Sequence, residues 1–381
     1  MKTYLCLFTG GERKKMEVKG LFNVARKEFI DHLTSRKFII ILGLFLIISA
    51  IAVHQGIGDY NDMLEDYKEQ MSHIKEVEGP EGPVKWMPEK PSILLIFRRM
   101  SWQITMLGGI LAIAMGFDLI SREKESRSLK SLLSHPIFRD EIINGKALGG
   151  ILALVFAIGI ALIISFAMLL LFSIVPDLDE FTRITLFGVV SVLFLLSYFS
   201  IALMTSTVSR DSGSSLIYAL IILFALSFFM PTFENVVVES VVGEPPEFPG
   251  VHHVHIIGAP SASENESEAI KPIEPVPIEE EEWKRYEEES NAYWEKRSAI
   301  HDAISVVVPN DNFQAVTEAI LNPHFEGLRY GVRYEPPTTE GEEKSLREAL
   351  EIVWKNILAL IVFPLVFFAL AYVKFMRLDI R

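Results

Sequence analysis

Six long apolar runs constrain this chain more than any other feature of its sequence. A membrane span needs about 20 mainly apolar residues, and six stretches approach or exceed this length. They are Phe38–Val53, Ser101–Ile120, Ala147–Val175, Ile184–Ser209, Ser214–Pro231 and Val353–Phe375. The first is short, but Lys37 and His54 at its ends can extend toward the polar surface. Half of the 381 residues are hydrophobic, and their concentration in these runs predicts an all-α polytopic membrane protein.

The Lys and Arg residues divide the connecting segments into two groups. One group holds 19 Lys and Arg among 76 residues, and the other holds 16 among 174. The richer group comprises 1–37, 121–146, 209–213 and 374–381, and the poorer group comprises 54–100, 176–183 and 232–350. Because basic residues concentrate on the cytoplasmic side, we expect both termini, including the tail 376–381, to be cytoplasmic. The net charge of −13 arises in the outer segments and gives no indication of a nucleic-acid partner.

Helical patterns continue on both sides of the first span. Between Leu21 and Lys37, apolar residues recur at helical spacing opposite charged ones, which is typical of an amphipathic helix in the membrane interface. This helix is expected within the cytoplasmic segment 1–37. After the span, apolar residues keep the same spacing as far as Ile74, so the outer loop 54–100 is expected to begin with a helical extension.

The segment 232–350 is expected to be an acidic extracytoplasmic insert between spans five and six. Residues Glu244–Pro277 contain seven prolines among acids and serines, which is typical of an extended or disordered linker. Predicted helices in the insert are Glu279–Ile304 and Asp311–Leu321. Ser345 and Glu348 form a capping-box pattern, which predicts the start of the helix that leads into the sixth span.

The segment 121–146 is the longest polar stretch between two apolar runs on the predicted cytoplasmic side. Its six Lys and Arg residues lie among acids. Leu129, Leu132 and Leu133 recur at positions i, i+3 and i+4, so they give a short helix one apolar edge. Pro136 ends that helix. A charged helix with an apolar edge is suited to docking into a groove of a partner protein.

The predicted spans contain few ionisable residues. None has Lys, Arg, Glu or His near its middle. Asp118, near the inner end of the second span, is expected to pair with the nearby Arg122. Because charges within spans mark proton and ion pathways, their scarcity counts against a secondary transporter that acts without ATP.

The sequence lacks the motifs that carry chemistry in other proteins. It has no G-x-x-x-x-G-K-[ST] for nucleotide binding, no H-E-x-x-H and no G-x-S-x-G. His252, His253 and His255 lack a fourth ligand at a suitable spacing, so they do not predict a metal site. We therefore expect no catalytic, cofactor-binding or metal-binding residues and no enzymatic activity in this chain.

The run Pro91–Lys146, with GFDLISREKES followed by LKSLLSHPIFRDEIINGK, resembles the permeases of type-2 ATP-binding-cassette (ABC) transporters. In that family, an acid-rich Glu-Arg-Glu precedes Gly-Thr-Leu, Leu-Leu-Ser-x-Pro-x-x-Arg and a Gly-Lys that opens the third span. The matching residues here are Glu123, Glu125, Leu129, Leu132, Leu133, Ser134, Pro136, Arg139, Gly145 and Lys146. Arg127 and Ser128 stand where the family commonly has Gly-Thr. The order of the six spans also follows the family.

This resemblance implies a permease subunit of the cell membrane, an exporter of an unidentified substrate, that pairs with a second copy or a related permease. A separate cytoplasmic ABC ATPase subunit would bind ATP and move the coupling segment 121–146. The charges expected to fix the register of that contact are Glu123, Glu125, Arg127 and Arg139, and the leucine edge would fill the groove of the ATPase.

Two other classes stay open on the sequence alone. One is a membrane-anchored receptor or assembly factor that works through the segment 232–350. The other is an ATP-independent secondary transporter. An ATPase gene beside the gene for this chain would favour the permease over both.

Overall fold

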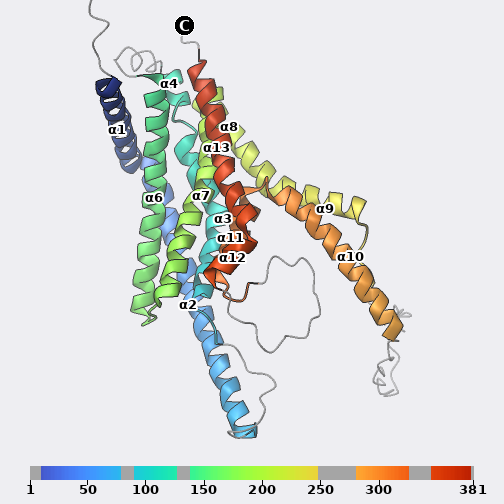
Figure 1. Ribbon diagram of the computed structural model, residues 1–381. Helices are drawn as coiled ribbons and strands as arrows, with labels where there is room; N and C mark the ends of the chain where they lie inside the picture. The colour runs from blue at the N-terminus through green and yellow to red at the C-terminus, as the bar shows by residue number, and fades with distance from the viewer. Residues whose placement is uncertain (1–9, 79–89, 127–137, 248–279, 326–344, 379–381) are drawn as a thin grey trace, which may run out of the picture. The chain divides into compact units, whose positions relative to one another are not determined.

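The structure, a computed structural model, describes residues 10–78, 90–126, 138–247, 280–325 and 345–378. All regular secondary structure in these ranges is helical (Figure 1). The helices are α1 (Gly10–Thr34), α2 (Arg36–Glu78), α3 (Leu94–Gly116), α4 (Ser121–Glu125), α6 (Arg139–Leu171), α7 (Leu178–Val208), α8 (Ser212–Phe224), the π-helical turn η1 (Ala225–Phe229), α9 (Met230–Val241), α10 (Glu280–Ser305), α11 (Pro309–Leu321), α12 (Leu346–Ile352) and α13 (Trp354–Met376).

Six of these helical stretches are long and apolar enough to cross a membrane. They are Arg36–Ile74, Leu94–Glu125, Arg139–Leu171, Leu178–Val208, Ser212–Val241 and Trp354–Met376. The prediction of an all-α protein with six candidate spans is confirmed. The orientation of the spans and the extracytoplasmic position of 232–350 stay predictions.

The chain divides into two units. The first contains Met1–Met230, Ser305–Leu328 and Tyr334–Arg381, and the second contains Pro231–Ile304 and Arg329–Arg333. In the described part of the second unit, Glu234 of α9 and His301 of α10 are 2.7 Å apart from Oε1 to Nδ1. Both side chains are largely buried.

Helices α3 and α7 form the centre of the first unit. In their most apolar stretches, 67% and 72% of the residues are buried, against 6% for the span that begins with α8. The two helices approach closely because Gly116 has no side chain. A Cβ atom there would lie 2.7 Å from the Cβ of Ala202. Phe194 of α7 then stacks on Phe313 of α11 with ring centroids 4.6 Å apart, which joins α11 to the same core.

Helix α1 packs lengthwise along the first part of α6. The contacts advance together, from Val24 beside Gly145 to Phe29 beside Phe156, so the two helices run in the same direction. A Cβ atom on Gly149 would lie 2.6 Å from the Cβ of Glu28. Glycine at this position therefore lets α1 approach α6. The apolar face predicted for Leu21–Lys37 is used at least partly in this packing, and its place in the membrane interface stays a prediction.

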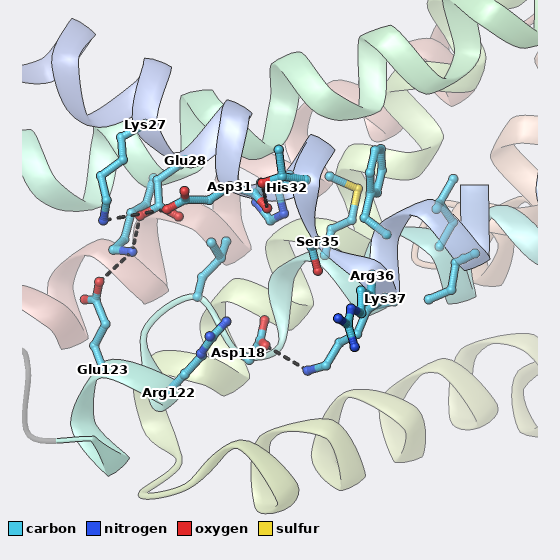
Figure 2. A pocket seen from close by; sticks show the side chains of 18 of the residues that line it. Lys27, Glu28, Asp31, His32, Ser35, Arg36, Lys37, Asp118, Arg122 and Glu123 are labelled. Atoms are coloured by element: carbon cyan, nitrogen blue, oxygen red, sulfur yellow. Dashed lines mark hydrogen bonds and ion pairs between the residues drawn. The ribbon is translucent and has the colours of Figure 1, made fainter. Parts of the chain in front are cut away.

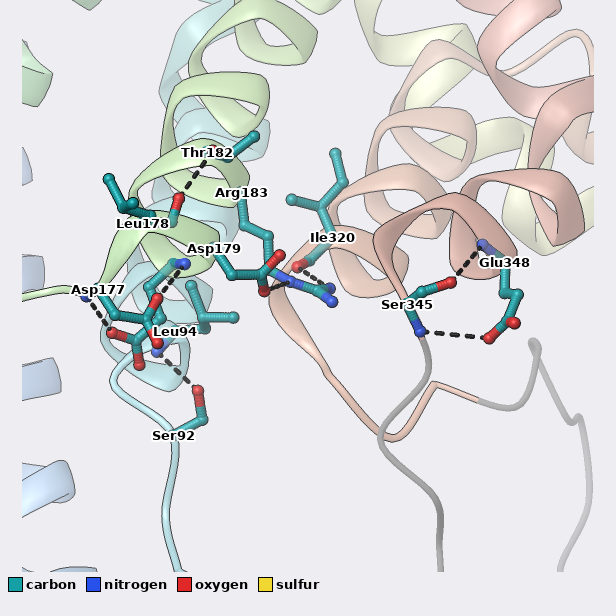
Figure 3. A network of polar contacts seen from close by, with 11 residues as sticks. Ser92, Leu94, Asp177, Leu178, Asp179, Thr182, Arg183, Ile320, Ser345 and Glu348 are labelled. Carbon is teal, nitrogen blue, oxygen red and sulfur yellow. Dashed lines mark hydrogen bonds and ion pairs between the residues drawn. The ribbon is translucent and has the colours of Figure 1, made fainter.

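Neutral hydrogen bonds and the side chain of Arg183 fix α11 in the first unit. The Tyr198 hydroxyl donates to the Asn310 side chain at 2.7 Å, and the hydroxyls of Ser101 and Thr317 are 2.9 Å apart. The buried Arg183 of α7 donates to the carbonyl of Ile320, the next-to-last residue of α11 (Figure 3). Basic side chains stabilise such helix ends because the last carbonyls lack partners within the helix.

The capping box predicted at Ser345 is confirmed. The Glu348 backbone N–H donates to the Ser345 hydroxyl, and the Ser345 N–H donates to the Glu348 carboxylate at 3.2 Å (Figure 3). Two N–H groups that a helix start leaves without partners are thereby satisfied. Helix α12 begins here and passes through Val353 into α13.

Candidate coupling site

The structure describes the two flanks of the predicted coupling segment. Six of the predicted site residues lie outside the described residues. They are Arg127, Leu129, Leu132, Leu133, Ser134 and Pro136. Glu123, Glu125 and Arg139 are described, the first two on α4 and the third at the start of α6.

Glu123 belongs to a buried cluster of three charges. The Nζ atom of Lys146 lies 2.8 Å from a Glu123 carboxylate oxygen and 2.6 Å from a Glu28 carboxylate oxygen (Figure 2). Only 4% of the Lys146 side chain is exposed. Because a buried ammonium is costly without partners, two close carboxylates account for its position. The cluster joins α1, α4 and α6.

The start of α4 is fixed by the end of α7. The Ser206 hydroxyl accepts the backbone N–H groups of Ile120 and Ser121, both at 2.9 Å. In return, the Lys124 ammonium donates to the backbone carbonyls of Ser206, Thr207 and Ser209. A cation at the C-terminal end of a helix binds carbonyls that have no partner in the helix. Helix α4 and the end of α7 therefore cap each other.

Glu125 reaches the start of α8. Its carboxylate accepts the Ser212 hydroxyl at 3.1 Å and the Ser212 backbone N–H at 3.3 Å. The N-cap of α8 is Asp211, whose carboxylate accepts the backbone N–H and the hydroxyl of Ser214, both at 2.8 Å. These hydrogen bonds lower the pKa of Asp211. Negative charge therefore gathers at the N-terminus of α8, where the helix dipole favours it.

Arg139 bonds α6 to the end of α13. Its guanidinium donates to the backbone carbonyl of Leu378 at 3.0 Å and to that of Met376 at 3.4 Å. One residue earlier, the Phe138 backbone N–H donates to the Glu141 carboxylate at 3.2 Å, which satisfies a donor at the start of α6. The downstream flank of the coupling segment is thus attached to the sixth span.

A cavity of about 950 Å³ lies beside the charge cluster. Lys37, at the start of α2, pairs with Asp118 at 3.1 Å on its wall (Figure 2). The prediction that Asp118 pairs with Arg122 is therefore wrong. The reason is that α2 returns beside the end of α3, which brings a lysine 81 residues away in the sequence closer than the neighbouring arginine.

His32 of α1 lies on the wall of the same cavity. Burial is the main cause that lowers the pKa of His32, and the nearby Lys146 acts in the same direction, although Glu28, Asp118 and Asp31 oppose it. Its Nε2 atom is buried and has no hydrogen-bond partner in the described part of the chain.

The described residues show no arrangement that would hold a metal ion. No group of three or more His, Cys, Asp and Glu side chains is close enough among them. The three histidines at 252, 253 and 255 lie outside the described residues. What the site offers chemically is a set of strong, directional contacts between helices, which suits the transmission of movement.

Comparison with known proteins identifies the family. A family model for the ABC-2 family transporter protein matches residues 22–380. A search of curated proteins finds no match. The matched range includes all six candidate spans and the polar segment between the second and the third. The chain therefore belongs to the ABC-2 transporter family and is a membrane component of an ABC transporter.

Proposed function

We propose that this protein is the permease subunit of an ATP-driven exporter whose ATP is hydrolysed by a separate subunit. That ATPase docks on the coupling segment 121–146. The family membership supports the general role, and the high density of basic residues in 121–146 supports a cytoplasmic position for this segment. The substrate is exported across the cell membrane.

The attachment of both flanks of the segment to the spans carries this proposal. Glu123 reaches α6 and, through Lys146, α1. Lys124 and Glu125 reach α7 and α8, and Arg139 reaches α13. A displacement of the segment by a partner would therefore act on several spans at once. Packed helices respond to such a push as rigid bodies, because their interiors are dense.

The residues of the segment have separate roles in this proposal. The leucine edge, Leu129 with Leu132 and Leu133, enters an apolar groove of the ATPase, where most of the binding energy of such contacts arises. The turn that orients this edge contains Ser134 and Pro136. The charges proposed to fix the register of the contact are Glu123, Glu125, Arg127 and Arg139. Glu123, Glu125 and Arg139 also bond to other helices of the chain, so they would join the partner to the spans.

The proposed topology follows from the charge distribution. The termini and 121–146 are cytoplasmic, and 232–350 is an extracytoplasmic insert. The permease works as a pair with a second copy or a related permease. In the span that begins with α8, 6% of the most apolar stretch is buried, and in the span that α13 forms the share is 17%. These helices therefore offer apolar faces to lipid or to a partner, which supports the pairing.

Co-purification tests the proposal directly. The permease is expressed in its membrane with the ATPase encoded beside its gene, and the Leu132→Glu variant is compared with wild type. We expect the variant to insert normally, to lose the ATPase and to lose transport-linked ATP hydrolysis, because a carboxylate in an apolar groove stays unpaired. Leu178→Glu is the matched control. It makes the same change at an 87% exposed leucine at the start of α7.

Three results would count against the proposal. If Leu132→Glu binds the ATPase as well as wild type, the coupling contact lies elsewhere. If both leucine variants lose the ATPase, the effect is general and not specific to the segment. If no ATPase binds to the wild-type chain, the insert 232–350 becomes the working part of a receptor or assembly factor.

A further inference from the structure

The cavity beside the charge cluster has no role in the coupling proposal. It is bounded by the end of α1, the start of α2, the end of α3, α4 and the start of α6. Its volume of about 950 Å³ falls at the upper end of the range for small-molecule sites, about 300–1,000 Å³. The described residues that line it all belong to the first unit.

Two of the five Lys and Arg side chains on the wall of the cavity have no acidic partner in the described part of the chain, and the wall carries one positive charge in excess of its four acids because Lys146 pairs with two of them. Each of the four acidic side chains is paired with a lysine, at distances from 2.6 to 3.7 Å. The two arginines of the wall, Arg36 and Arg122, have no ion pair or side-chain hydrogen bond among the described residues. Figure 2 shows Arg122 and Lys37 around Asp118, with Arg36 beside Lys37. The cavity therefore presents two planar guanidinium groups without an anion.

Another part of the wall is apolar. Phe38 and Ile41 come from α2, and Leu111 and Met115 come from α3. Arg36 is the first residue of the first candidate span, and Arg122 lies close to the end of the second. The cavity thus lies where two spans leave the apolar part of a membrane. This position holds whichever side of the membrane it faces.

We infer that this cavity binds the phosphodiester headgroup of a membrane phospholipid, with Arg36 and Arg122 on the phosphate and the acyl chain beside Phe38 and Ile41. Guanidinium groups match phosphate oxygens in pairs of parallel hydrogen bonds. The apolar wall favours a ligand with an acyl chain, because methylene groups are removed from water there. A free phosphate ion has no methylene groups and gains nothing from this wall. A lipid at this position contacts α1, α2, α3 and α4 together, so it stabilises the helices next to the coupling segment.

Lipid binding can be measured without any ATPase, so the result is independent of the proposed coupling. The purified full chain in detergent is incubated with phosphatidylglycerol, and bound lipid is counted by native mass spectrometry. The double variant Arg36→Ala/Arg122→Ala is compared with Arg26→Ala/Arg210→Ala, which removes two exposed arginines that do not line the cavity. We expect the first double variant to bind lipid at least about tenfold more weakly, and the control to bind like wild type.

A second variant separates a lipid from a free phosphate ion. Ile41→Trp keeps both arginines and narrows the apolar wall. It should reduce phosphatidylglycerol binding and leave the binding of inorganic phosphate, measured by calorimetry, at the wild-type level. Circular dichroism and gel filtration would show whether Arg36→Ala/Arg122→Ala folds. If it does not fold, Ile41→Trp alone tests whether the cavity binds the lipid.

The inference fails on either of two results. Equal lipid binding by the two arginine double variants would mean that the cavity arginines do not hold the lipid. Unchanged lipid binding in Ile41→Trp, together with displacement of the lipid by inorganic phosphate, would mean that the site takes a phosphate ion and no acyl chain.

Discussion

Two polar regions of the first unit are held together by different chemistry. The region around Lys146 is ionic, since one buried ammonium binds two carboxylates from different helices. The region around α11 relies largely on neutral groups, such as the paired hydroxyls of Ser101 and Thr317 and the bond from Tyr198 to Asn310. The buried Arg183 also contacts α11, but its acidic partner Asp179 is exposed. The ion pair between Arg98 and Glu318 in this region is partly exposed.

This difference has an energetic meaning. A buried ion pair contributes little net stability, but removal of one partner leaves a charge in a poor environment. A neutral hydrogen bond contributes about 1 kcal/mol and costs a similar amount when it is lost. The ionic region therefore tolerates the loss of a partner poorly, and two of its three charges, Glu123 and Lys146, belong to the proposed coupling segment. The neutral region can adjust at small cost.

Loss of the central cation should have the largest effect. Lys146→Met leaves Glu28 and Glu123 without their common partner, and we expect a loss of about 3–5 kcal/mol in the free energy of unfolding. Thermal unfolding in detergent measures it. The triple variant Lys146→Met/Glu28→Gln/Glu123→Gln should recover much of the loss, because no buried charge remains. A triple variant as unstable as the single one would show that packing and not charge is responsible.

The docking of α1 depends on the missing side chain at Gly149. Gly149→Ala places a Cβ atom 2.6 Å from the Cβ of Glu28, and we expect a destabilisation of about 1–3 kcal/mol with faster proteolysis of α1. Gly159→Ala is the matched control on the same helix, since a Cβ atom there meets nothing within 4 Å. It should be neutral or slightly stabilising. Equal behaviour of the two variants would contradict the packing described here.

A substitution in the neutral region should reduce the free energy of unfolding by less than one in the ionic region. Thr317→Val removes the hydroxyl that meets Ser101 and keeps the shape of the side chain, so we expect a loss of about 1 kcal/mol in unfolding free energy. Thr185→Val is the comparison, because that hydroxyl is exposed and, among the described residues, bonds only the Phe181 carbonyl of its own helix. If Thr317→Val lost as much unfolding free energy as Lys146→Met, the contrast between the two regions would be contradicted.

A fall in pH should weaken the packing of α1 against the rest of the first unit, by less than the substitutions described above. The pKa of His32 is lowered, mainly by burial, so the docked helix takes up a proton less readily than the released one. The docked state thus has its full stability above the ordinary histidine pKa of 6.5, and loses it as the pH falls below that value. Hydrogen exchange in α1 at about pH 8 and about pH 5.5 measures the change. His32→Gln should reduce the difference in hydrogen exchange between the two pH values. If the variant shows the same difference as wild type, other groups cause the pH dependence.

The sequence predicts the helices better than their contacts. The apolar runs predict all six candidate spans, and Ser345 with Glu348 predicts a helix start, because both signals are local. The pairing of Lys146 with Glu28 joins residues 118 positions apart, which a local pattern cannot reveal. Glycine residues allow this pairing, since the missing side chain of Gly149 lets α1 approach α6.

The candidate site shows the same limit. The resemblance to the family pattern predicts Glu123, Glu125 and Arg139 as contacts for a partner. The structure places each of them in a contact within the chain. Lys124, which caps the end of α7, is not among the residues that the family pattern predicts, although it lies between two matched glutamates in the sequence. Its carbonyl partners lie more than 80 residues away and were not predictable.

The Lys146 cluster has one carboxylate more than it has ammonium groups. Glu123 is on α4, within the proposed coupling segment, and Glu28 is on α1. If α4 moves away and carries Glu123 into water, Lys146 and Glu28 remain as an electroneutral pair. A lysine with a single partner would instead be stranded as a bare cation in a poorly polarisable interior. The surplus acid therefore allows α4 to detach and rebind repeatedly without leaving Lys146 as an unpaired buried charge.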